Sequence, residues 1–233
     1  AFEPYFIALF EFYRTAIKWN QTQRLLLRPW QEDDADELYK YAKDLQVGPA
    51  AGWPVHTSVE NSREIIRTVF SGVETYAVVL SKHANLLAAS IDYRQVNNIG
   101  LPDNECEVGY WIGVPYWGQG LIPEAVRELQ HRAFEVLGMQ KMWAGYFDGN
   151  EKSKRVQEKC GFKYMFTKCN VSSQLVGELR TEHITCLTKM EWLQVSKFQF
   201  IGQQNISRNS VISGIVPAFF VYFCENSAGI WIA

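Results

Sequence analysis

The sequence lacks the residue patterns that identify several classes of protein. Its five cysteines form no C-x-x-C pair and its four histidines are scattered, so no metal-ligand spacing is present. Its 23 Lys and Arg against 25 Asp and Glu give a net charge of −2, which offers no electrostatic case for nucleic acid. We therefore expect no metal, no nucleic-acid partner and a reducing, cytoplasmic setting.

A membrane-spanning run is also missing. The most apolar stretch, residues 211–224, is shorter than the ~20 residues that a membrane helix needs, and it contains Gly214 and Pro217. The aromatic-rich residues 1–20 have no basic start before a long apolar core, so they do not resemble a signal peptide. We expect no transmembrane segment and no membrane partner.

What is present is an ordinary globular composition, 47% hydrophobic, with alternating and helical patterns in succession. The patterns predict strands at residues 24–29, 75–81, 86–93, 105–112, 141–147, 162–167 and 183–190. Helices are expected at residues 33–42, 57–70, 123–137 and 150–161, the second opening with a capping box from Thr57 to Glu60. Residues 47–56, rich in Gly and Pro, are expected to form a loop.

The most informative stretch is residues 107–125, which reads as a strand, a tight glycine loop and a helix start. Gly118 and Gly120 flank one residue, Pro123 suits a first helical position, and Gly138 can end the helix. A glycine loop that leads into a helix offers outward-pointing N–H groups and a favourable dipole, which suit an anion such as phosphate; an ordinary strand–helix turn is the alternative. The Rossmann and P-loop signatures are not matched, because Pro occupies position 123 and no Gly-Lys-Ser/Thr triplet occurs.

Three sequence motifs, one of them within this stretch, resemble those of a known protein family. The segment Tyr110-Trp-Ile-Gly-Val-Pro-Tyr-Trp-Gly-Gln-Gly120, followed by Glu124-Ala125, resembles the coenzyme A loop of the GNAT acetyltransferases. The segments Asn150–Phe162 and Thr22–Trp30 resemble two further motifs of the family, in its order and at its spacing. The nearest likeness is to the branch that includes ribosomal-protein N-terminal acetyltransferases, and it covers residues 21–193.

The resemblance implies a fold and a domain division. The expected order β-α-α-β-β-β-α-β-α-β-β is that of an α/β (α+β) protein with a mixed, mostly antiparallel and partly splayed central sheet flanked by helices. We expect an N-terminal extension at residues 1–20, the acetyltransferase domain at 21–193, and a C-terminal tail of unknown role at 194–233.

The resemblance also implies which residues hold acetyl-CoA, the expected co-substrate. The strand end would pair with the pantetheine arm, and the loop and helix start would hold the pyrophosphate through backbone N–H groups. These positions are Ile112, Gly113 and Val114, and then Trp117, Gly118, Gln119, Gly120, Leu121 and Ile122. Asn150 and Ser153 resemble coenzyme-contacting residues, although a simple helix cap and an exposed helix serine are the alternatives. Pro115 departs from the family, which often has Arg or Gln there.

For catalysis, Glu107 is the candidate general base, with Glu105 as a rival two residues away and a surface glutamate as the alternative. The family often places a tyrosine seven residues after the asparagine as general acid, but this chain has Gln157 there. Ser153 or water would then take that role. Trp53 and His56 are expected to border the acceptor site, with a packed loop as the alternative.

The expected function is therefore N-acetyl transfer from acetyl-CoA to a primary amine by direct attack in a ternary complex. The acceptor could be a protein N-terminus, an antibiotic or a small metabolite. The sequence does not decide whether the protein forms a homodimer. Two rival interpretations are a coenzyme-binding regulator without turnover and an interaction module built from the apolar tails.

Overall fold

The computed structural model describes residues 20–81, 86–94, 102–173 and 177–194. All of them belong to the first of two compact units into which the chain divides, residues 1–194 and 195–233. The expected N-terminal extension, apart from Asn20, and the expected tail, apart from Gln194, lie outside the described residues.

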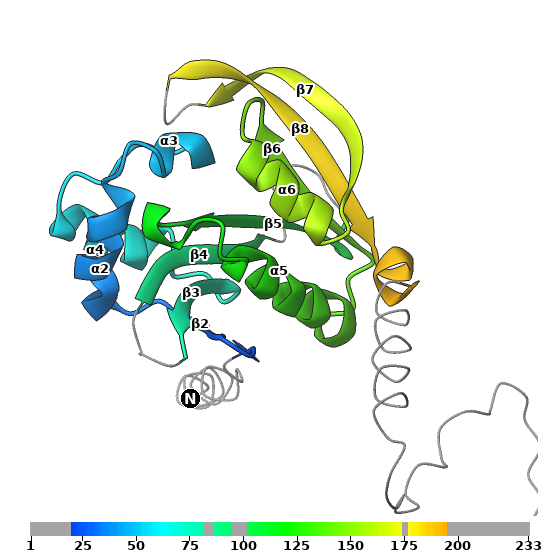
Figure 1. Ribbon diagram of the computed structural model, residues 1–233, viewed down its shortest axis with the longest axis horizontal. Helices are drawn as coiled ribbons and strands as arrows, with labels where there is room; N and C mark the ends of the chain where they lie inside the picture. Colours follow the sequence, from blue (N-terminus) through cyan, green and yellow to red (C-terminus); the bar gives the residue numbers. More distant parts are fainter. Residues whose placement is uncertain (1–19, 82–85, 95–101, 174–176, 195–233) are drawn as a thin grey trace, which may run out of the picture. The chain divides into compact units, whose positions relative to one another are not determined.

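The described residues form one eight-stranded sheet of order β1-β2-β3-β4-β5-β6-β8-β7 (Figure 1). Its strands are β1 (Asn20–Gln21), β2 (Leu25–Pro29), β3 (Thr75–Leu80), β4 (Leu86–Arg94), β5 (Glu105–Ile112), β6 (Lys141–Phe147), β7 (Lys163–Ser173) and β8 (Glu178–Thr188). Neighbouring strands are antiparallel except β5 and β6, which are parallel. This confirms the mixed, mostly antiparallel sheet.

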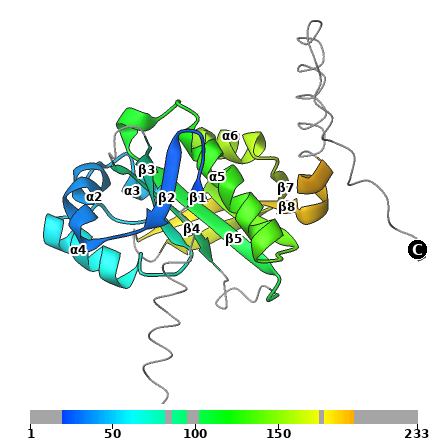
Figure 2. The ribbon, with the colours of Figure 1, turned by 90° about the horizontal axis from the view of Figure 1, so that it is seen from below.

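Helices cover both faces of the sheet, with α2 and α4 on one side and α5 and α6 on the other (Figure 2). The helical segments are η1 (Glu32–Asp34), α2 (Ala35–Ala42), α3 (Gly48–Ala51), α4 (Val59–Thr68), η2 (Val114–Tyr116), α5 (Leu121–His131), η3 (Arg132–Val136) and α6 (Glu151–Lys159). The α5 helix continues into η3, a π-helical turn, and Gly138 follows with a left-handed φ of 72°.

Strand alternation divides the buried side chains between two cores. Leu25 and Leu27 of β2 join the core beneath α5, whereas Leu26 packs against the core beneath α2 and α4. On β5, Val108 belongs to the first core and Trp111 to the second. Because successive strand residues point to opposite faces, each central strand supplies both cores at once.

The sheet splays between β5 and β6. The two strands pair at only three positions, from Glu105 opposite Lys141 to Glu107 opposite Trp143. Beyond that point β5 stays paired with β4 as far as Ile112, while β6 stays paired with β8 as far as Phe147. The facing edges of β5 and β6 are therefore open to another extended chain.

Some expected boundaries are wrong in detail. The segment expected as a loop contains the short helix α3, in which Pro49 occupies an early position that needs no N–H donor. The cap of α4 is Ser58 rather than Thr57, because the Ser58 side chain accepts from the Asn61 N–H. Pro123 is the third residue of α5 and not the first. A backbone N–H at this position would have no partner within the helix, so the missing N–H of proline costs no hydrogen bond.

The last two strands also differ from expectation. Both run for 11 residues, and β7 carries two register irregularities. Their outer parts are mostly exposed and polar, so they lack the buried alternation by which a strand is recognised.

Within residues 20–81, 86–94, 102–173 and 177–194, no helix has the length and apolar character needed to cross a membrane. The same residues contain no group of three or more His, Cys, Asp and Glu side chains placed to hold a metal ion.

Candidate active site

The splay opens into a cleft of about 1280 Å³. Strand β5 and the glycine loop form one wall, and the end of β6 with the first two turns of α6 forms the other. Residues 46–51, which include α3, and two side chains of β8 complete the lining. Strands, a helix start and a short helix thus meet around one space.

The glycine loop has the geometry of an anion site. Gly118 and Gly120 have φ angles of 75° and 74°, and a Cβ atom at Gly118 would meet nothing within 4 Å. Among the described residues, no backbone carbonyl accepts from the N–H groups of Gly118, Gln119 or Gly120. These donors, together with the start of the 11-residue helix α5, are available to a phosphate.

Arg24, just before β2, holds this loop from outside the cleft. Its Nη1 donates to the Gln119 carbonyl oxygen at 3.0 Å, and its Nε pairs with Glu124 at 2.6 Å. Glu124 also accepts from the Thr22 hydroxyl at 2.5 Å and the Arg24 N–H at 3.0 Å. The motif at residues 22–30 therefore contacts the coenzyme-loop motif directly, although the two are about a hundred residues apart.

Most of the expected coenzyme residues line this cleft. They are Ile112, Trp117, Gly118, Gly120, Leu121, Ile122, Asn150 and Ser153. Gly113, Val114 and Gln119 do not belong to the lining; a Cβ at Gly113 would lie 2.7 Å from the Tyr41 ring, so this position allows close packing of α2. The Ile112 carbonyl accepts from Trp117 Nε1 at 2.9 Å, which fixes the indole at the turn.

Helix α6 adds positive charge that the sequence reading missed. Lys152, Arg155 and Lys159 all line the cleft, and their spacing of three and four residues places them along one side of the helix. Lys152 Nζ lies 3.4 Å from the centre of the Trp117 ring. The spacing of these three residues could have identified the positive face of the helix from the sequence. Their charges suit the phosphates of a coenzyme.

Asn150 has two roles in the structure. Its Oδ1 accepts from the Ser153 N–H at 3.1 Å and so caps α6, as expected. Its Nδ2 donates to the Ala50 carbonyl at 3.2 Å, and Arg180 donates to the neighbouring Pro49 carbonyl at 2.5 Å. These bonds attach α3 to the far wall of the cleft.

The two candidate bases on β5 have different surroundings. Glu107 is partly buried and lines the cleft beside the last paired position of the splay. Glu105 is buried and accepts from Lys141 at 2.8 Å and from Trp143 Nε1 at 2.7 Å. Burial acts to raise the pKa of Glu105, but these two hydrogen bonds outweigh it and lower the pKa. Glu105 is thus committed to an ion pair and lies outside the cleft lining, whereas Glu107 belongs to it.

A further carboxylate in the cleft, on β8, was not foreseen. Glu182 of β8 lines it, and a Cβ added to Gly145 would lie 2.5 Å from Glu182 Oε1. Burial raises the pKa of Glu182, with only partial opposition from Lys168. No described residue donates a hydrogen bond to this carboxylate. A raised carboxyl pKa in a cleft is typical of a functional group.

Ser153 lies between Tyr110 and Gln157 on the α6 side of the cleft. Its Oγ is 3.0 Å from the Tyr110 hydroxyl and 3.4 Å from Gln157 Nε2. Gln157 is buried, so the position where the family often has an acid faces the protein interior.

The two expected acceptor residues occupy packed positions. Trp53 packs edge-on against Trp111, which lines the cleft, with ring centres 5.5 Å apart. His56 is buried, its Nδ1 lies 2.8 Å from the Ser62 hydroxyl, and burial lowers its pKa to about 4. Neither side chain belongs to the cleft lining. The geometry favours the packed-loop alternative for both side chains.

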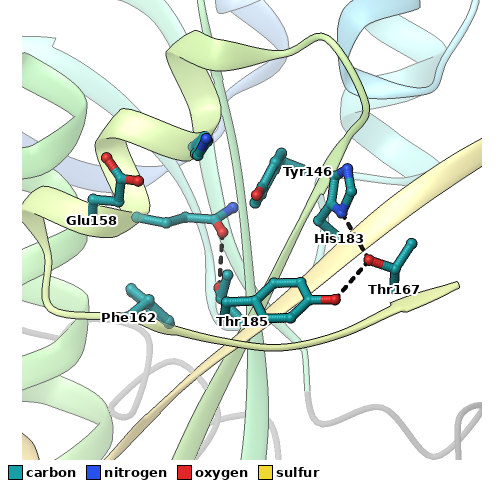
Figure 3. A pocket seen from close by; sticks show the side chains of 9 residues that line it. Tyr146, Glu158, Phe162, Thr167, His183 and Thr185 are labelled. Atoms are coloured by element: carbon teal, nitrogen blue, oxygen red, sulfur yellow. Dashed lines mark hydrogen bonds between the residues drawn. The ribbon is translucent and has the colours of Figure 1, made fainter.

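A second, smaller hollow of about 390 Å³ lies among α6, β6, β7 and β8 (Figure 3). The His183 Nδ1 is 2.9 Å from the Thr167 hydroxyl, which is 2.8 Å from the Tyr164 hydroxyl. His183 Nε2 lies 3.1 Å from Asp148 Oδ1. These bonds link β7 to β8 and β8 to the end of β6.

Comparisons with known proteins point to one family. The family model described as "Acetyltransferase (GNAT) domain" matches residues 24–163, which is more than half of the chain. An uncharacterized N-acetyltransferase of Bacillus licheniformis is 25% identical over 146 residues, covering 61% of this chain and 80% of that protein.

Two further matches agree. A Bacillus subtilis protein provisionally named a ribosomal N-acetyltransferase is 37% identical over 67 residues, which cover 29% of this chain and 37% of that protein. The crystal structure of a GNAT-family acetyltransferase from Bacillus anthracis superimposes with a TM-score of 0.65 at 20% identity, covering 73% of this chain and 98% of that one. The last likeness concerns the fold alone.

Proposed function

Because the chain belongs to the GNAT acetyltransferase family, we propose that it transfers the acetyl group of acetyl-CoA to a primary amine by direct attack in a ternary complex. The observation that carries the proposal is the splay, where an open strand edge, an anion-binding glycine turn and a carboxylate line one cleft. Each of these serves one requirement of acyl transfer, namely holding the donor, placing its phosphates and removing the proton of the amine.

The donor would be held mainly by the backbone. The open edge of β5 offers main-chain groups to the pantetheine arm, which can pair with it as an added strand would. The N–H groups from Gly118 to Ile122 face the pyrophosphate, and the cations of α6 add charge. Because the backbone supplies these contacts, Pro115 in place of a longer polar side chain does not remove the phosphate site.

The acceptor would lose its proton to a carboxylate on the cleft wall. An alkyl amine with a pKa near ~10 is almost wholly protonated at neutral pH, so it needs a base before or during attack. Glu107 is the proposed base because it lies at the point where the strands separate. Glu182 is the second candidate, because burial raises its pKa and its carboxylate, once ionised, holds a proton more readily than an ordinary carboxylate does.

The acceptor class follows from the same surroundings. Two carboxylates with an aromatic neighbour, Trp111, suit a cationic amine that carries some apolar surface. A protein N-terminus and a small-molecule amine both meet this description, and we propose one of these as the acceptor.

A panel of amines tests the proposal. Purified protein is incubated with acetyl-CoA and each of several alkyl amines, aminoglycosides and peptides with free N-termini, and released coenzyme A thiol is measured. We expect release that depends on one class of amine, together with thermal stabilisation by acetyl-CoA. Stabilisation without release across the panel would support the regulatory alternative, and absence of both would contradict the family-based function.

A further inference from the structure

Gln157 is held in place by hydrogen bonds on both of its amide atoms. Its Oε1 accepts from the Thr185 hydroxyl at 2.8 Å, so its Nε2 must be the donor that reaches the Gly145 carbonyl at 2.9 Å. An amide group cannot supply a proton to a leaving thiolate. Gln157 therefore joins α6 to β6 and β8, and the acid must be another group.

The Tyr110 phenol reaches the same region from β5. It lines the cleft, and its hydroxyl crosses to the first turn of α6, where it donates to the Ser153 carbonyl at 3.1 Å. The same hydroxyl lies 3.0 Å from Ser153 Oγ. The contact spans the open part of the splay, since Tyr110 lies beyond the last residue of β5 that pairs with β6.

Resting on the function proposed above, we propose that Tyr110 is the general acid that protonates the departing coenzyme A sulfur, and that Ser153 positions its hydroxyl. When the tetrahedral intermediate collapses, the carbon–sulfur bond breaks and its electron pair goes to sulfur. The phenolic proton passes to the same sulfur, so free coenzyme A thiol leaves. The phenolate is reprotonated by water once the cleft opens to solvent.

The surroundings of Tyr110 suit a proton donor. Burial raises the pKa of Tyr110 to about 12, against a partial opposing effect of its hydrogen bonds to Ser153 and Gln157. The phenol consequently carries its proton throughout the neutral pH range and loses it only at strongly alkaline pH. The same surroundings would also disfavour a free thiolate, which favours protonation of the departing sulfur.

Tyr110 is preferred to Ser153 on chemical grounds. A phenol is a far better acid than an aliphatic hydroxyl, and the second partner of Tyr110, the Ser153 carbonyl, can only accept. With its proton directed to that carbonyl, the Tyr110 oxygen is free to accept from Ser153 Oγ. Ser153 thus sets the orientation of the phenol without giving up a proton itself.

The test compares three single variants on the best amine of the panel. Tyr110→Phe should lower kcat by about tenfold or more. A positioned acid usually contributes about 10²–10⁴-fold, but a smaller contribution is expected here because a thiolate is a good leaving group even without protonation. Its affinity for coenzyme A by calorimetry should stay within about threefold. Ser153→Ala should cause a smaller loss. Tyr164→Phe, which removes a hydroxyl outside the cleft, is the matched control and should leave kcat unchanged.

A second measurement separates acid catalysis from a structural role. A fluorinated tyrosine at position 110 has a lower phenol pKa and the same shape, so the alkaline limb of the kcat profile should move to lower pH. The same replacement at position 164 should not move it.

Three results would overturn the assignment. They are a loss of less than about threefold in Tyr110→Phe, an alkaline limb that stays in place with fluorotyrosine, and a larger loss in Ser153→Ala than in Tyr110→Phe. If the wild-type protein releases no thiol with any amine, the proposed function itself fails, and the assignment fails with it.

Discussion

At the scale of single residues, the proposed chemistry turns on which carboxylate takes the proton of the amine. Glu107 and Glu182 both line the cleft, from strands on opposite sides of the splay, whereas Glu105 is held in an ion pair with Lys141. A carboxylate can accept a proton only when it is ionised. The pH dependence of turnover should therefore distinguish the two, because burial raises the pKa of Glu182 above its ordinary value.

We expect Glu107→Gln to lower kcat at neutral pH by about 10²–10⁴-fold while coenzyme affinity stays nearly unchanged. Glutamine keeps the size of the side chain but cannot take the proton. The loss should shrink as pH rises toward the pKa of the amine, and it should be smaller for an N-terminal amine, near ~8, than for an alkyl amine, near ~10.

Glu105→Gln is the matched control on the same strand and should change stability more than turnover. If Glu182→Gln instead shows the large loss, the base lies on β8. The acid limb of the wild-type profile should then sit above the pH of an ordinary carboxyl group. Full activity in both the Glu107 and Glu182 variants would exclude these two residues as the base.

Gly120 provides the second test at this scale. Gly120→Val should weaken acetyl-CoA binding sharply, because a φ of 74° is unfavourable for a branched side chain, so valine would distort the loop whose N–H groups we propose hold the phosphates. Gly138→Val is the matched control, since Gly138 also has a positive φ, of 72°, but lies outside the cleft lining. Equal coenzyme affinity in the two variants by calorimetry would contradict the phosphate site.

Residues with local signals could be predicted from the sequence, and those that depend on distant contacts could not. The left-handed glycines and the Asn150 cap follow from their immediate neighbours, and the structure agrees with both. Glu182 and the Tyr110–Ser153 contact depend on the register of β8 against β6 and on the seating of α6. The residues next to Glu182, Tyr110 and Ser153 in the sequence do not indicate how β8 pairs with β6 or where α6 lies.

At the scale of elements, the end of the described domain is held by a capping box. Thr188 and Glu191 bond reciprocally, with the Thr188 N–H and hydroxyl donating to Glu191 Oε2 at 3.0 and 2.8 Å, and residues 189–194 are helical. Lys163 of β7 pairs with the same carboxylate at 2.7 Å. The hydrogen bond from Lys163, then that from Thr188, lowers the pKa of Glu191 to about 2.

This lowered pKa gives a pH-dependent prediction. A carboxylate with a depressed folded-state pKa stabilises the fold above its unfolded value of ~4.3, and that contribution is lost as pH falls toward about 2. Glu191→Gln should lower the free energy of unfolding by about 1 kcal/mol at neutral pH, with the deficit fading in acid. Urea unfolding at several pH values measures it. Glu135→Gln, on the exposed side of η3, should show no such trend.

Element types were predictable where one face of the element is buried. The amphipathic patterns of α4 and α5 and the alternation of β2 and β5 gave the right elements, because burial enforces the period. The short helix α3 was missed, since its four residues lie in a Gly- and Pro-rich stretch and depend on bonds from Arg180 and Asn150. Distant donors of this kind leave no local pattern.

At the scale of the whole molecule, the described domain ends with contacts that belong to its core. Trp192 packs on Phe134 with ring centres 5.5 Å apart and also meets His131 at 6.3 Å. These contacts join residues 189–194 to the end of α5 and to η3. The boundary of the folding unit should therefore fall after Gln194 and not at the end of β8.

Two truncations test this boundary. A chain that ends at Gln194 should keep its fold and its response to acetyl-CoA, because it retains the capping box and the Trp192 contact. At a hundredfold excess over its dissociation constant, acetyl-CoA should stabilise it by about 2.7 kcal/mol, as for the full chain. A chain that ends at Thr188 loses both features, so its melting temperature should fall by several degrees. If the longer truncated chain fails to fold or to bind acetyl-CoA, residues 195–233 contribute to the domain, and its proposed limit at Leu193 is wrong.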